Sequence, residues 1–313
     1  MKNTPRLQGF LAPTDFEWFQ FLAGIEQLDE VNFWRPNNKA LKAISPNEPF
    51  LFKMKSPHNA IGGFGIFVRY SYLPDWLAWE SFGFANGASN LDEMRRNIGA
   101  YKNRTGNRET HSGSIGCIML ANPVFFPQEL WIRQPADWER NIVQGKTYDL
   151  TIGEGKRIWT ECLARAQGMW QYPGQIEEQV ARYGDETTIT PRLGQGTFRV
   201  LVTEAYQRTC AMTTEHSLPV LEAAHIKPYA LGGTHSVNNG LLLRSDVHRL
   251  FDKGYVTVAP DYRIEVSNRL KDEFHNGKAY YPYHGSKLLL PRDPTNHPNA
   301  RLLEYHQNEI YLG

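Results

Sequence analysis

The sequence predicts an α+β fold in two parts: a small, strongly curved mixed β-barrel, followed by a strand–strand–helix unit. Three observations support this. The 313 residues are enough for two domains of ordinary size. Short apolar runs bounded by turn residues dominate the first half, with one or two helical stretches. Eight of the ten histidines lie at or after His216, so chemistry is expected in the last third. The predicted parts are residues 1–152, a helical connector at 153–190, and residues 191–313.

Composition excludes several classes of protein. Apolar residues make up 41% and charged residues 21%, which is typical of a folded chain. There is no apolar run of about 18 residues and no secretory signal pattern, so neither a membrane span nor export is expected and the predicted location is the cytoplasm. Cys117, Cys162 and Cys210 lie far apart, so neither a disulfide framework nor a structural zinc site is expected. With a net charge of +1, any nucleic-acid contact must use a local cluster of positive charge.

In the N-terminal half, three segments have the composition of strands, namely 50–55, 65–73 and 115–126. The segment 89–104 reads as a helix, with Ser89 or Asn90 as its N-cap and acids in its first turn. This order of elements is the basis for the expected barrel.

The next segments separate the two parts. A helical stretch at 155–172 is followed by Pro173-Gly174, and a polar region runs to about Gly196. A second helix is expected at 198–209, because Phe198, Val202, Ala205 and Tyr206 fall on one face.

The last third predicts a strand at 219–226, a turn, a strand beginning at 239–244 and a helix from Ser245, its expected N-cap, to a stop at Gly254. On that helix His248 and Asp252 are four residues apart and therefore share a face. An imidazole and a carboxylate so placed make half of a divalent metal site.

His225, at the end of the first of these strands, can act as a base, because neutral imidazole accepts a proton from water near pH 7. The amide of Asn239 can hydrogen-bond backbone across the loop and fix the hairpin. A metal and a base together suit phosphodiester hydrolysis. Taken singly, His225 could equally be a core histidine, and Asn238 is an alternative to Asn239.

These residues resemble the HNH, or ββα-metal, nuclease motif: His225 and Asn239 are 14 apart, and Asn239 and His248 are 9 apart. Residues 192–313 are similar to a subgroup of restriction endonucleases with that motif. The resemblance implies that His225 is the general base, Asn239 the hairpin-fixing residue, and His248, with Asp252, a metal ligand. It implies Mg²⁺ or Mn²⁺ as cofactor, with another transition metal as the alternative. Many relatives place a further ligand directly before the base, where this chain has Ala224.

Three N-terminal stretches, at 29–37, 50–67 and 77–94, resemble the PUA-like superfamily that includes EVE and ASCH domains. The resemblance implies a reader of modified bases in which a flipped nucleotide stacks on aromatic rings. The residues expected to form the pocket are Asn32, Trp34, Trp76, Trp79, Asn86 and Ser89. The alternative for each aromatic residue is an ordinary place in the core.

Basic residues could hold the DNA backbone, with a solvated helix face as the alternative. The candidates are Arg95, Arg96, Lys102, Arg104, Arg244 and Arg249. His235 is expected at the surface, with a phosphate contact as the alternative.

The function predicted is a modification-dependent DNA endonuclease, with double-stranded DNA carrying a modified base as partner. A homodimer is left open, because one such domain cuts one strand. The alternative is a module that binds modified RNA or DNA through the barrel and carries an inactive or RNA-directed HNH domain.

Overall fold

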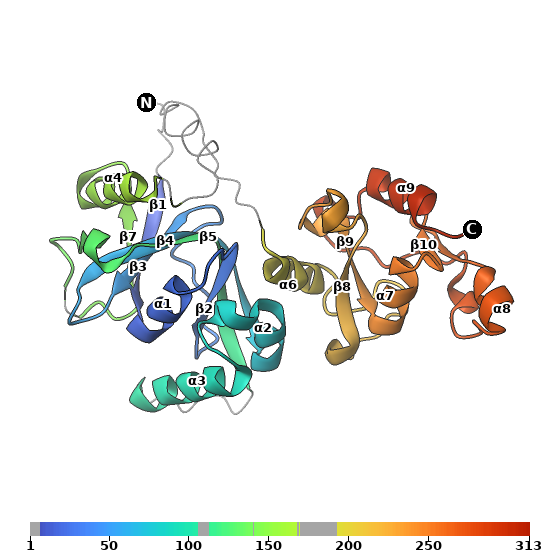
Figure 1. Cartoon of the computed structure of the whole chain (residues 1–313), viewed down its shortest axis with the longest axis horizontal. Helices are drawn as coiled ribbons and strands as arrows, with labels where there is room; N and C mark the ends of the chain where they lie inside the picture. Colours follow the sequence, from blue (N-terminus) through green and yellow to red (C-terminus); the bar gives the residue numbers. More distant parts are fainter. Residues whose placement is uncertain (1–6, 106–112, 140, 168, 170–192) are drawn as a thin grey trace. The chain divides into compact units, whose positions relative to one another are not determined.

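The computed structural model describes residues 7–105, 113–139, 141–167, 169 and 193–313. Its contacts divide the chain into two compact units, Met1–Gly194 and Gln195–Gly313. Figure 1 shows the elements of each unit, which we describe separately.

Seven strands of the described residues form one sheet in the first unit (Figure 1). Their order is β2-β5-β4-β3-β1-β7, with β6 paired to β4. β1 runs parallel to β3, and the other pairs are antiparallel. The strands are β1 (Gln8–Thr14), β2 (Glu30–Arg35), β3 (Pro49–Met54), β4 (Ala60–Pro74), β5 (Ser114–Phe125), β6 (Ile132–Arg133) and β7 (Lys146–Asp149).

This sheet is curved but open, so the expected closed barrel is not seen in the described part of the chain. β2 and β7 are the two ends of the strand order. Register shifts in β4, between Phe64 and Ile66 and between Phe67 and Arg69, bend the sheet. The guanidinium of Arg35 at the end of β2 donates to the Gln144 carbonyl, two residues before β7, at 3.3 Å. A side chain, not a backbone ladder, thus connects the two edges.

Helices pack on both faces of this sheet. They are α1 (Phe16–Ala23), α2 (Asp75–Phe82), the 3₁₀ helix η1 (Gly83–Asn86), α3 (Leu91–Thr105), the 3₁₀ helix η2 (Gln128–Leu130) and α4 (Gly153–Ala166). The expected connector at 153–190 begins with α4, which buries Ile158, Trp159 and Cys162 in one cluster with Phe64. Residues 168 and 170–190 of that connector lie outside the described residues.

The second unit contains the predicted strand, loop, strand and helix. These are β8 (Leu221–His225), β9 (Gly240–Arg244) and α7 (Ser245–Asp252), with α6 (Gln195–Ala205) before them. Its other elements are β10 (Val256–Val258), β11 (Ile264–Val266), α8 (Arg269–Phe274), α9 (Ala300–Glu309) and the 3₁₀ helices η3 (Leu218–Val220), η4 (Tyr229–Leu231), η5 (Val237–Asn239), η6 (Tyr281–Tyr283) and η7 (Pro294–Asn296). Arg244, not Ser245, is the N-cap of α7.

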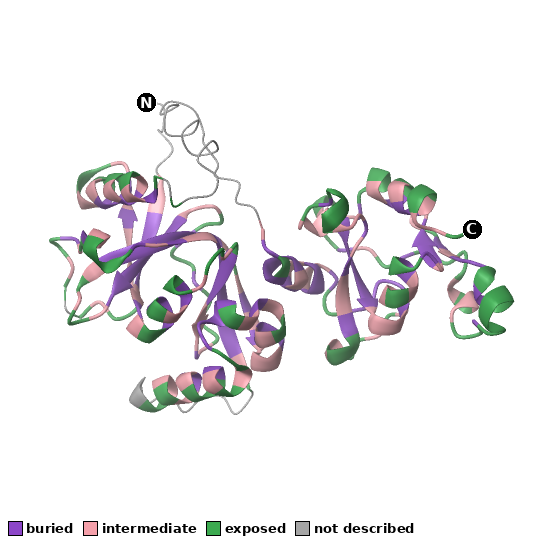
Figure 2. Cartoon of the chain, in the orientation of Figure 1, coloured by how far each residue is buried: buried purple, intermediate pink, exposed green. Residues whose placement is uncertain are grey.

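The core of the second unit lies beneath the hairpin of β8 and β9. Buried side chains of α6, the hairpin and α7 meet there, including Phe198, Val202, Leu242 and Phe251. Figure 2 shows the strands of both units largely buried and the outer helix faces exposed. The hairpin therefore presents its end residues from a rigid base.

No helix in the described ranges is long and apolar enough to cross a bilayer.

Candidate functional site

His225 ends β8 opposite Gly240 of β9 and is held on two sides. Its ring stacks on Phe198 of α6, with centroids 4.0 Å apart and planes 13° apart. Its Nε2 lies 3.0 Å from Nδ1 of His235, in the loop between the two strands. The imidazole can therefore neither flip nor tilt without losing a partner.

Asn239, just before β9, closes the loop between β8 and β9 through its side-chain amide. Its Oδ1 accepts from the Lys227 backbone N–H at 2.9 Å, and its Nδ2 donates to the carbonyls of Lys227 and Thr234 at 3.0 and 2.9 Å. The side chain is fully buried. An amide has both the donor and the acceptor for this pattern, and no carboxylate or hydroxyl of similar size offers both in this geometry.

His248 lies on α7 between two carboxylates. Its Nδ1 is 2.7 Å from Glu222 Oε2, on β8, and its Nε2 is 3.3 Å from Asp252 Oδ2, one turn further along α7. Sequence reasoning missed Glu222. The signal was its place in the predicted strand, three residues before His225, where a charged side chain interrupts an apolar run. Ala224, where many relatives have a ligand, is fully buried.

Burial sets the ionisation of two of these groups. It lowers the pKa of His225 to about 4, with the neighbouring His235 and His248 acting in the same direction. His225 is therefore neutral near pH 7 and can accept a proton. Burial likewise raises the pKa of Asp252, and Glu222 adds to this, while His248 opposes it.

The donors around His248 suit a divalent cation that has few protein ligands. A carboxylate on Nδ1 fixes the ring so that the lone pair of Nε2 faces outward, as with many metal-bound histidines. Nε2 and the Asp252 carboxylate then provide two adjacent ligands. The described residues contain no group of three His, Cys, Asp or Glu side chains placed to hold a metal. Water and phosphate oxygens would complete the coordination.

The comparison with known families agrees with this geometry. Residues 210–259, which span β8, β9, α7 and β10, match the family described as HNH endonuclease. This segment is an HNH endonuclease domain. The chain is thus a nuclease, a phosphodiester hydrolase, and HNH nucleases generally use a divalent metal ion.

Outside the HNH domain the comparisons are sparse. No curated protein matches the chain. Among solved structures, one match is described as modification dependent TagI restriction endonuclease. It is 12% identical with a TM-score of 0.28, covering 91% of this chain and 77% of the other.

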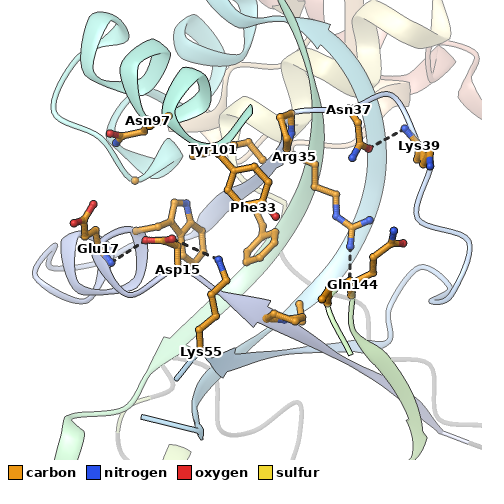
Figure 3. A pocket seen from close by; sticks show the side chains of 18 residues that line it. Asp15, Glu17, Phe33, Arg35, Asn37, Lys39, Lys55, Asn97, Tyr101 and Gln144 are labelled. Carbon is orange, nitrogen blue, oxygen red and sulfur yellow. Dashed lines mark hydrogen bonds and ion pairs between the residues drawn. The ribbon is translucent and has the colours of Figure 1, made fainter. Parts of the chain in front are cut away.

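The first unit, which does not include the HNH domain, contains a pocket of about 680 Å³. It lies beside the end of β2, between α1, α3 and the segment before β7. Figure 3 shows Phe33 in the middle, with Asp15 and Lys55 on one side and Arg35 and Gln144 on the other. Four aromatic residues line it, namely Trp18, Phe33, Trp34 and Tyr101.

Charged side chains lie on both sides of this pocket. Asp15, which caps α1, is 3.5 Å from the ammonium of Lys55. That ammonium also lies 5.4 Å from the centre of the Tyr101 ring. Across Phe33, Arg35 is fixed by Gln144, and burial lowers the pKa of its guanidinium. The pocket therefore combines flat apolar walls with oriented charge.

Of the six residues predicted for a base pocket, Trp34 lines it. Asn32 and Asn86 are fully buried and bonded to one another at 2.8 Å. Trp76 and Trp79, on α2, are not among the lining residues. Neither is Ser89, which is bonded to Glu93 at the start of α3. Asn32 is therefore held inside the fold by Asn86 and does not reach the pocket.

The basic residues expected to contact the DNA backbone differ in exposure and in whether they are paired with a carboxylate. Arg95 is paired with Asp75 at 2.8 Å, and Arg244 with Asp246 at 2.6 Å. Arg96 and Arg249 are exposed, and Lys102 is half-buried. The side chain of Arg104 lies outside the described residues.

Proposed function

We propose that this protein is a modification-dependent DNA endonuclease whose first unit receives a flipped, modified base and whose HNH domain cuts the strand. The observation that carries the proposal is the 680 Å³ pocket of the first unit, lined by four aromatic residues and a fixed acid–lysine pair.

The size and chemistry of the pocket suit a nucleobase. Pockets of a few hundred Å³ with apolar walls and a few polar groups hold small planar ligands. A base extruded from the duplex is read by stacking and by hydrogen bonds to its edge. Phe33 and Tyr101 offer ring faces, and Asp15 offers carboxylate oxygens that accept from an exocyclic amine. This pocket replaces the one expected from Trp76, Trp79, Asn86 and Ser89.

In the HNH domain, His225 acts as general base. It takes a proton from a water molecule as the water oxygen attacks phosphorus, and the bond to the leaving oxygen breaks. Asn239 keeps the loop closed so that the base stays in place. His248 and Asp252 would hold the divalent cation, which stabilises the charge that develops on the phosphate.

The experiment uses one plasmid prepared in four forms, carrying unmodified, methyl-, hydroxymethyl- or glucosyl-cytosine. Each form is incubated with the full chain and Mg²⁺ or Mn²⁺, and nicked and linear products are measured. We expect cleavage to be selective for one or more modified forms and to be lost in EDTA.

Two results would count against the proposal. Equal cleavage of all four forms would remove the modified-base requirement. Cleavage of none, together with binding of modified RNA, would favour the alternative of an RNA-directed binding module.

A further inference from the structure

His235 lies within hydrogen-bonding distance of the His225 ring, and it comes from the loop that Asn239 closes. The two rings meet through Nε2 of His225 and Nδ1 of His235, 3.0 Å apart. On its other side His235 stacks on Tyr229, with centroids 4.4 Å apart and planes 7° apart. Sequence reasoning expected this histidine at the surface, but it is partly buried.

The loop fixes His235 through its backbone. The Thr234 carbonyl, adjacent to His235, accepts from Asn239 Nδ2 at 2.9 Å. Gly233, one residue earlier, leaves no room for a side chain, since a Cβ there would lie 2.0 Å from the Lys227 carbonyl oxygen. The position of His235 relative to His225 is therefore set by the same closure that forms the hairpin.

The position of the proton on His225 determines which of its two ring nitrogens can accept a proton from water. A neutral imidazole has one N–H and one lone pair. If Nε2–H donates to His235, the lone pair is on Nδ1. If the proton were on Nδ1, no lone pair would be available there for a water molecule.

We propose that His235 is a positioning residue for the nuclease reaction: its Nδ1 accepts from Nε2–H of His225, which leaves Nδ1 of His225 free to take the proton of the attacking water. The proposal deepens the proposed function, on which it rests for the role of His225 as base.

The step balances with these groups alone. One O–H bond of water breaks, its proton forms a bond to Nδ1 of His225, and the water oxygen forms the bond to phosphorus. The bond between phosphorus and the leaving oxygen breaks, and that oxygen takes a proton from solvent. His225 becomes an imidazolium whose Nε2–H is stabilised by the lone pair of His235.

The first test needs no cleavage. In the full chain with ¹⁵N-labelled histidine at pH 7, without metal or DNA, long-range ¹H–¹⁵N spectra report the tautomer of His225, with its signals assigned by the loss seen in His225→Ala. We expect the Nε2–H tautomer in the wild type, its loss in His235→Ala, and its retention in His235→Asn, because the Asn oxygen lies close to the place of Nδ1. A wild-type Nδ1–H tautomer, or an unchanged spectrum in His235→Ala, would overturn the proposal.

The second test is single-turnover cleavage under saturating protein. We expect His235→Ala to slow cleavage by about 100-fold, within the range for general-base catalysis, with DNA binding unchanged. His235→Asn should recover most of the rate, and His275→Asn, an exposed histidine in α8's C-cap, serves as the matched control. An Asn variant as slow as the Ala variant would overturn the acceptor role.

The two tests also separate this proposal from the function on which it rests. If the wild type cuts no DNA, the proposed function fails, while the spectra still decide the partnership of His225 and His235.

Discussion

The surroundings of His225 suit the role of general base that we propose for it. Burial beside Phe198 and two further histidines lowers its pKa to about 4, so it stays neutral across the physiological range.

The first prediction concerns this residue. His225→Ala should reduce cleavage by at least about 100-fold, because the proton acceptor is lost. DNA binding should persist, because the substitution removes no backbone contact. In the wild type the rate should fall on the acid side only as the pH approaches 4, where His225 becomes charged and can no longer accept a proton. Single-turnover rates from pH 4 to 8 measure both effects. A variant that cuts as fast as the wild type would exclude His225 as base.

Asp15 is the second residue whose charge has an expected function. Asp15→Asn keeps a side chain that caps α1 equally well, so the fold should be preserved. It replaces one carboxylate oxygen by an NH2 donor and removes the negative charge, and we expect the preference for the modified base to fall by about 10- to 100-fold. Competition binding with modified and unmodified duplexes measures this. Asp75→Asn, which breaks the pair with Arg95 outside the pocket, is the matched control. Unchanged discrimination in Asp15→Asn would argue against base recognition by Asp15.

At the scale of elements, the loop between β8 and β9 depends on a single amide. Asn239→Ala leaves one N–H and two carbonyls without their partners, and we expect the second unit to lose on the order of 2–4 kcal/mol of stability. Denaturant unfolding followed through that unit measures the loss. The neighbouring Asn238→Ala is the control and should change stability by far less. Equal losses would mean that the amide of Asn239 is not what closes the loop.

The elements that could be predicted from the sequence are those whose defining residues lie close together along the chain. The β8–β9–α7 arrangement was predictable because His225, Asn239 and His248 lie within one short segment, and the spacing of His248 and Asp252 is a property of any α-helix. Glu222 and His235 were missed as partners because their contacts depend on how the loop and strand fold back, which spacing does not encode. Asn32 was expected in the base pocket, but it is buried against Asn86, and the sequence does not show which residues pair across such a distance.

At the scale of the whole molecule, two histidines whose pKa values are lowered in the folded chain link stability to pH. His306 on α9 is almost wholly buried, with Nε2 3.1 Å from the Phe251 carbonyl, and burial lowers its pKa to about 4, as it does for His225. Both folded-state values lie below the unfolded value of about 6.5. The unfolded chain therefore binds more protons between these values, and stability falls as the pH drops from about 6.5 to 4.

His306 alone should account for a loss on the order of 3 kcal/mol over that range. Thermal or denaturant unfolding of the wild type and of His306→Gln at pH 7 and pH 4 measures it. The His306→Gln variant should be less stable than the wild type at pH 7, and its free energy of unfolding should fall less on acidification. A parallel loss in both proteins would exclude His306 as a source of the pH dependence.

The large-scale features were the hardest to predict. Strand composition indicated a sheet but not whether its edges meet, and the described strands leave β2 and β7 unpaired to each other. Similarly, the basic residues could be counted, but the pairing of Arg95 with Asp75 and of Arg244 with Asp246 depends on which carboxylates the fold brings near.

The bond between α9 and α7 has a practical consequence. The Phe251 carbonyl that His306 contacts belongs to the helix that carries His248 and Asp252, and Leu312 further donates to the Gly254 carbonyl at 2.9 Å. The motif that matches the HNH endonuclease family ends at residue 259, about 40 residues before α9 begins. A cutting module transplanted to a different binding domain would thus have to extend through Leu312, because the matched motif by itself lacks the contacts that hold the helix with His248 and Asp252.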